Sequence, residues 1–161
     1  MVMYLLSLTY IMYVVHDERM TTPTNERRTF GFADARKSLK AILDTSDRGG
    51  LSVVTRGGSS ASVVNTDRLR AFLVRNTPAN VQVVPEDGAW AMFIPGLPLA
   101  AEGTTLEEAT LDLIDALRDY AEDWEDHLRT APNHHGNWAL VQIIDASTDE
   151  QLAEWLTGRT Q

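Results

Sequence analysis

Two glycine-containing turns between β-prone runs most strongly constrain what this chain can fold into. LSVVT and SASVVN flank the turn RGGS within residues 51–65, and VQVV and AWAMF flank a second turn at Glu86-Asp87-Gly88. Short runs rich in Val around such turns predict β-hairpins. A segment with helical spacing of apolar residues follows each hairpin. The pattern therefore predicts an α+β chain with two small sheets.

The first region, residues 27–75, is predicted to run strand, helix, strand, strand, helix. RRTFGF is the first predicted strand, and TDRLRAFLV is a helix capped by Asn65 or Thr66. The helix between them ends at Gly49 or Gly50. Its buried stripe is expected to consist of Phe32, Ala35, Leu39, Ile42 and Leu43. Such a unit has a thin core, so we expect it to pair with a second copy of itself.

Charge is distributed unevenly along the 161 residues. Residues 1–75 contain 11 Lys and Arg against 7 Asp and Glu, a net charge of +4, whereas residues 76–161 contain 3 against 16, a net charge of −13. A basic half can approach phosphates, and an acidic half attracts basic proteins. Within the basic half, cationic residues gather around the first predicted helix, at Arg27, Arg28, Arg36, Lys37 and Lys40. The alternative is a solvated helix face with an intrahelical Lys40–Asp44 pair.

Residues 28–74 resemble the N-terminal domain of Phd/YefM antitoxins. FADARKSLKAILD is similar to that family's first helix, and RGGLSVVTRGGSSASVVN is similar to its hairpin. The resemblance implies a βαββα domain that dimerises and binds a palindromic operator. The DNA-binding residues that it implies are Arg28, Arg36, Lys37, Lys40 and Arg56. Gly57 stands where a second basic residue is common in that family.

The second region, residues 79–161, is predicted to begin with three strands, the third within GLPLAAEG. Thr105 and Glu108 form a capping-box pattern before a long amphipathic helix. NWALVQIID at 137–145 is predicted to be a further strand, and TDEQLAEWLTG a terminal helix capped by Thr148. Four tryptophans are expected in the core, with one of them as a candidate interface anchor: Trp90, Trp124, Trp138 and Trp155.

Residues 80–128 are similar to HicB-like antitoxin domains, through the charged hairpin turn, FIPGLP, the loop near AEGTT and LEEA. The resemblance implies a βββαβ(α) domain on which a basic toxin docks. The candidate toxin-binding residues are Asp119, Glu122, Asp123 and Asp126. Together, the two resemblances imply a type II antitoxin that neutralises a protein toxin, a RelE/YoeB-type ribonuclease, and represses its own operon. The alternative is a stand-alone transcriptional regulator whose second domain senses a ligand or dimerises.

Several kinds of chemistry are not expected. The chain has no cysteine and none of the Gly-rich phosphate-binding or nucleophile motifs, so we expect no enzyme activity, no cofactor and no metal site. The expected partners are the toxin, operator DNA and a second or further copy of the chain in the cytoplasm, with no membrane. The apolar leader at residues 1–26 is too short to span a bilayer and lacks signal-peptide features. It packs on the body or precedes a true start at Met20.

Overall fold

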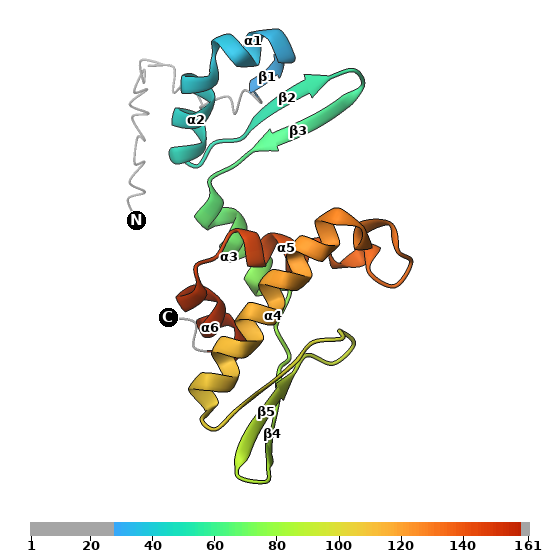
Figure 1. The fold of residues 1–161 in the computed structure, drawn as a ribbon. Helices are drawn as coiled ribbons and strands as arrows, with labels where there is room; N and C mark the ends of the chain where they lie inside the picture. The colour runs from blue at the N-terminus through green and yellow to red at the C-terminus, as the bar shows by residue number, and fades with distance from the viewer. Residues whose placement is uncertain (1–27, 159–161) are drawn as a thin grey trace, which may run out of the picture.

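Two three-stranded sheets organise residues 28–158, which are the residues that this computed structural model describes (Figure 1). The sheets consist of β1 (Arg28–Gly31), β2 (Ser52–Arg56) and β3 (Ser59–Val63), and of β4 (Gln82–Glu86), β5 (Ala89–Phe93) and β6 (Ala100–Gly103). β1 and β2 are parallel, and the other neighbouring strands are antiparallel. The predicted α+β class is confirmed. The expectations for residues 1–26 and for Arg27 lie outside the described residues.

Both hairpins turn through two residues in the left-handed region. Gly57 and Gly58 have φ angles of 53° and 86°, and Asp87 and Gly88 have φ angles of 46° and 87°. Positive φ at both central residues is the requirement of a type I′ turn, whose twist matches that of the flanking strands. The Gly-Gly and Asp-Gly pairs therefore encode both turns locally, and both predicted hairpins are confirmed.

The first predicted helix is interrupted at Ser38, contrary to expectation. α1 (Phe32–Lys37) and α2 (Leu39–Asp47) are separate helices, because Ser38 has φ −107° and ψ 15°. The Ser38 N–H bonds to the Asp34 and Ala35 carbonyls, and its own carbonyl accepts from Ile42 N, so backbone hydrogen bonding continues through the bend. Serine is a weak helix former that tolerates such termini. The bend leaves both Ala35 and Ile42 buried.

The predicted buried stripe is only partly correct. Ala35 and Ile42 are buried, but Phe32, Leu39 and Leu43 are each about half exposed. Three short strands offer too little surface to cover two helices fully. The first sheet and its helices therefore retain an apolar outer surface.

α3 (Thr66–Asn76) joins the two sheets. The Asn65 side chain caps it by accepting from Arg68 N at 3.3 Å, as predicted. Near its start, the Arg68 guanidinium lies where a side chain at Gly49 would sit. Further along, Leu73 is buried in the core that α4 and the second sheet share. α3 thus contacts the first region near its start and the core of the second region further along.

The larger core lies between the second sheet and the helices that follow it. α4 (Leu106–Asp126) packs on β5 and β6, and its predicted capping box, made by Thr105 and Glu108, is confirmed. Gly103 allows the close approach, because a Cβ there would collide with the Ala109 backbone nitrogen. The residues of this core that are essentially inaccessible to solvent include Met92, Leu113, Leu117, Ile143 and Leu152.

The strand predicted at residues 137–145 is wrong. Trp138–Asp145 forms α5, which packs against α3 and α4. Val and Ile favour strands by propensity, but Leu140, Val141, Ile143 and Ile144 are all buried, and this spacing covers one face of a helix. The second region is therefore βββ followed by helices, without a fourth strand among the described residues.

The terminal helix is confirmed. α6 (Asp149–Thr157) begins with a capping box between Thr148 and Gln151 and ends at Gly158, which has φ 67°. Two short 3-10 turns, η1 (Leu128–Thr130) and η2 (His135–Asn137), lie in the loop between α4 and α5.

The tryptophans divide into two groups. Trp155 is buried and donates from Nε1 to the Thr77 carbonyl at 2.9 Å, and Trp124 is partly buried. Trp90 and Trp138 are exposed, so the expectation of four core tryptophans is only half correct.

Candidate functional site

Arg36 and Lys37 form the centre of the candidate DNA-binding surface. Both lie in the last turn of α1, both are exposed, and neither makes a hydrogen bond or ion pair with another residue of the 28–158 range. Cations at a helix C-terminus interact favourably with the helix dipole. Because Arg36 and Lys37 are exposed and unpaired in this range, their charges are available to a partner.

Arg56 lies next to α1 although it is 20 positions away from Arg36 in the chain. Its guanidinium carbon is 5.8 Å from the centroid of the Phe32 ring, a cation–π distance. Phe32 and Arg36 are one helical turn apart, so they lie on the same side of α1. The tertiary structure thus brings the arginine of the β2–β3 turn to the side of α1 that carries Arg36.

Arg28, the first residue of β1, is held differently. It is exposed, and its Nη1 donates to Thr45 Oγ1 of α2 at 3.3 Å. The first helix predicted from the sequence includes the residues of α2, and in the structure Arg28 contacts this second part of it. Only one of its donor groups is engaged there, so the other N–H groups remain available.

Lys40 has a partner within its own helix. Its Nζ is 2.7 Å from Asp44 Oδ2, the intrahelical pair that the sequence offered as the alternative. The hydrogen bond from Lys40 lowers the pKa of the Asp44 carboxyl. Because Ser38 separates α1 from α2, Lys40 does not belong to the helix that carries Arg36 and Lys37. Its charge is thus less available than theirs.

The four predicted toxin-binding carboxylates lie on the second half of α4. Asp119, Glu122, Asp123 and Asp126 are exposed and spaced by three and four residues, so they lie along one face of the helix. No basic residue occupies the last turn of α4. Carboxylates at a helix C-terminus are unfavourable with respect to the helix dipole, and a docked cation would relieve that cost.

Tyr120 and Trp124 fix the same half of α4 to the following loop. The Tyr120 hydroxyl lies 3.0 Å from His134 Nδ1 and accepts from Asn137 Nδ2, and Trp124 Nε1 donates to the His134 carbonyl at 2.8 Å. These bonds connect the acidic half of α4 to the loop between α4 and α5.

Residues 27–157 match the PHD-like family, described as the antitoxin of a toxin–antitoxin system of the RelE/RelB kind. The chain belongs to this antitoxin family. One family match thus spans both sheets of the antitoxin, and an antitoxin implies a cognate toxin as its partner.

The antitoxin is also similar to a crystal structure described as an antitoxin part of a proposed toxin/antitoxin system from Syntrophomonas wolfei subsp. wolfei. The TM-score is 0.68 at 19% sequence identity, and the match covers 80% of this chain and 95% of that one. At this identity the likeness shows a shared fold. No curated protein matches the antitoxin.

Between residues 28 and 158 of the antitoxin, no helix has the length and apolar character required to cross a bilayer. In the same range, no three His, Cys, Asp or Glu side chains are grouped so as to hold a metal ion.

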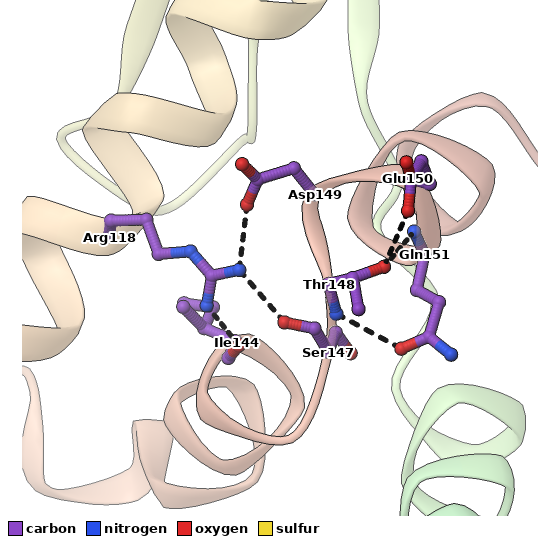
Figure 2. Close-up of polar contacts among 7 residues, drawn as sticks. All are labelled: Arg118, Ile144, Ser147, Thr148, Asp149, Glu150 and Gln151. Carbon is purple, nitrogen blue, oxygen red and sulfur yellow. Dashed lines mark hydrogen bonds and ion pairs between the residues drawn. The ribbon is translucent and has the colours of Figure 1, made fainter.

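Sequence reasoning missed two features of the antitoxin. One is an open hollow of about 290 Å³ on the β4–β5 hairpin, lined in part by Glu86, Asp87 and Glu102. The other is the role of Arg118, which binds the turn between α5 and α6 (Figure 2). The residues that line the hollow come from strands whose register the sequence does not reveal. The sequence does show that this region is acidic, because no Lys or Arg occurs between Arg75 and Arg118.

Proposed function

We propose that this antitoxin represses its own operon by binding operator DNA through Arg36, Lys37 and Arg56, with Arg28 and Lys40 in supporting positions. The observation that carries the proposal is the Arg56–Phe32 contact, which gathers unpaired cations from α1 and the β2–β3 turn on one surface. Lysine and arginine bonds to phosphates supply affinity, and arginine bonds to base edges supply sequence choice.

A homodimer or a higher oligomer is the proposed DNA-binding species. Leu39 and Leu43 of α2 are exposed, and so is Leu51, which lies between α2 and β2 in the chain. A surface of this kind is stabilised by burial against a second copy. Two copies related by a two-fold axis would present two basic surfaces, which suits an operator with inverted half-sites.

The proposed toxin is a basic ribonuclease of RelE or YoeB type. A ribonuclease requires a cationic surface to hold RNA, and the acidic half of the antitoxin offers carboxylates that can cover such a surface. Asp119, Glu122, Asp123 and Asp126 are the proposed contacts on α4. Inhibition by this route is steric and electrostatic, so the antitoxin acts by binding rather than by catalysis, in the cytoplasm.

Growth rescue tests this function. The open reading frame next to the gene is induced alone and then together with the antitoxin from an unrelated promoter. Toxicity that only the antitoxin relieves is the expected result. The Arg36→Ala/Arg56→Ala variant should still relieve it, whereas an Asn and Gln variant of the four α4 carboxylates should relieve it less. Toxicity without relief by the wild-type chain would instead favour the stand-alone regulator.

A further inference from the structure

α4 covers only part of the second sheet. It packs on β6 and β5, whereas all five residues of β4 are exposed. Neighbouring strands lie about 4.8 Å apart and a helix is about 10 Å wide, so one helix covers about two strands of a sheet. β4, at the edge of the sheet, is therefore left beside α4 without a covering helix among the described residues.

Strand pairing identifies the side chains on the α4 side of the sheet. Met92 of β5 points towards α4, where its sulfur lies 3.5 Å from Thr110 Oγ1. Side chains alternate along a strand, so Trp90 points to the same side. Paired residues of neighbouring strands also share a side. Val83 pairs with Met92, and so it faces the α4 side. Pro85 pairs with Trp90 and faces this side as well.

These side chains form an apolar surface beside α4. Val83 and Trp90 are 42% and 38% exposed. Leu106 lies one turn before Thr110 on the same side of α4, and it is 41% exposed. The strand partner of Trp90 is Gly103, which packs against the first turn of α4, so Trp90 and Leu106 lie at the same end of the sheet. We refer to Val83, Pro85, Trp90 and Leu106 as the apolar shelf.

The free edge of β4 does not suit an added strand. The two-residue turn at Asp87-Gly88 makes Glu86 and Ala89 a hydrogen-bonded pair. Bonded and non-bonded pairs alternate along antiparallel strands, so the backbone of Pro85 is directed to the free edge. Proline has no N–H, and a further strand would find no donor there. A partner is therefore expected to pack on the apolar shelf as a helix beside α4.

The charge around the apolar shelf favours a cationic partner. Asp87 at the hairpin turn and Glu107 in the first turn of α4 are exposed, and the chain has no Lys or Arg between Arg75 and Arg118. Residues 76–161 have a net charge of −13, so a second copy of this half would be repelled. A basic partner would be attracted to the same surface.

We propose that the apolar shelf binds an amphipathic helix of the basic toxin. The apolar side of that helix would lie on Val83 and Trp90, and its Lys and Arg side chains would reach Asp87 and Glu107 at the rim. Protein interfaces commonly combine an apolar core with a polar rim, and tryptophan is among the residues that contribute most to binding. The inference rests on the proposed neutralisation of a basic toxin. The apolar shelf is separate from the four carboxylates in the second half of α4.

The first test titrates the full-length antitoxin with an amphipathic helical peptide of Leu and Lys. NMR follows the valine methyl and indole N–H signals, each assigned with a substitution at its residue. A peptide with Ser in place of every Leu has the same charge without an apolar side, and it is the matched probe. The Val83 methyl and Trp90 indole signals should shift and saturate with the Leu/Lys peptide alone.

Two residues of the same types serve as internal controls in this titration. Val84 is 43% exposed on the opposite face of β4, and Trp138 is 50% exposed on α5, so their signals should stay in place. Equal shifts at Val83 and Val84, or equal shifts with both peptides, would mean diffuse attraction to the acidic half and would overturn the proposal. The absence of a saturable shift at Trp90 would overturn it too.

Two lysine substitutions locate the toxin on the sheet. Val83→Lys places a cation on the apolar shelf, and Val84→Lys places the same charge on the opposite face of the same strand. By calorimetry, Val83→Lys should weaken binding of the protein encoded next to the gene about tenfold, because an apolar contact is lost. Val84→Lys should leave binding nearly unchanged, and Trp90→Ala and Trp138→Ala form a second pair with the same expectation. Unchanged dispersion of the methyl signals confirms that each variant is folded.

Growth rescue separates this proposal from the proposed neutralisation. If the wild-type chain rescues growth, Val83→Lys should rescue less well than Val84→Lys. Equal rescue and equal affinity would overturn docking on the apolar shelf and leave the neutralisation standing. If the wild-type chain neither rescues growth nor binds the neighbouring protein, the proposed neutralisation fails, and the peptide titration alone decides whether the shelf takes a cationic helix.

Discussion

Arg118 of α4 donates from Nη2 to the carbonyl of Ser147, over 2.8 Å, and so ties the longest helix to the turn between α5 and α6 (Figure 2). The same guanidinium donates from Nη1 to the Ile144 carbonyl at the end of α5 and lies 2.8 Å from Asp149 at the start of α6. One side chain thus donates both to a carbonyl in the last turn of α5 and to a carbonyl of the turn that follows it.

Replacing Arg118 should destabilise the second half of the antitoxin. In Arg118→Met, two part-buried carbonyls lose the hydrogen bonds that they accept from the guanidinium, so the free energy of unfolding should fall by about 1–3 kcal/mol. Asp149→Asn is the matched control, because it removes only the ion pair, whose Asp side chain is 67% exposed, and should cost less than about 1 kcal/mol. Urea unfolding measures both. Equal losses would mean that the ion pair, and not the carbonyl bonds, holds the turn.

The start of α4 should respond to acid through Glu108. Its carboxylate accepts hydrogen bonds from the Thr104 hydroxyl, from Thr104 N at 2.9 Å and from Thr105 N at 3.3 Å. The Thr104 side-chain bond, followed by the backbone bonds, lowers the pKa of Glu108. A lowered carboxyl pKa in the folded state means that its stabilisation is present above the ordinary glutamate value, about 4.3, and is lost as the pH falls through the lowered pKa.

Glu108→Gln should therefore be less stable than the wild-type chain at neutral pH, and the difference should shrink as the pH approaches about 3. Thermal unfolding over this range measures it. Glu107→Gln removes a charge from the same helical turn without removing a cap, and it serves as the control. A Glu108→Gln difference that stays constant with pH would contradict the assignment of the stabilisation to the ionised cap.

DNA binding should depend more on Arg36 and Arg56 than on Lys40. Each unpaired cation that contacts a phosphate releases counterions, so Arg36→Ala and Arg56→Ala should each reduce the slope of log affinity against log salt by about 1. Lys40→Ala should change it less, because Lys40 already pairs with Asp44. Fluorescence anisotropy with DNA from upstream of the gene, over a series of salt concentrations, measures these slopes. A larger effect for Lys40 would move the contact surface to α2.

The apolar face of α2 should hold the oligomer together. Leu43→Glu places a charge on that face, where burial against a second copy would be costly, so the variant should be a monomer at concentrations where the wild-type chain is a dimer. Leu111→Glu on α4 is the control, since the two leucines are similarly exposed, at 47% and 54%. Light scattering during gel filtration gives the masses. Dissociation by Leu111→Glu but not by Leu43→Glu would place the interface on the second half.

The two helices around the α4–α5 loop show why local sequence succeeds in one place and fails in another. The capping box at Thr105 and Glu108 involves residues three apart, so its contacts form within one turn and can be predicted. α5 has β-branched residues that favour a strand, but its actual state depends on burial against α3 and α4 and on a donor from Arg118, 26 residues from Ile144. Tertiary packing overrides propensity in such short apolar segments.

The sequence by itself determined the features that arise within a few residues of each other. These are the two type I′ turns at Gly57-Gly58 and Asp87-Gly88, the caps of α3, α4 and α6, and the separation of basic and acidic halves. Only the tertiary structure decided that Arg56 meets Phe32, that Leu39 and Leu43 stay exposed, and that Glu86 and Glu102 flank one hollow. Those relationships join residues distant in the chain. They depend on which apolar surfaces are buried when the elements pack and on the register of the strands. Neither is encoded in any short segment.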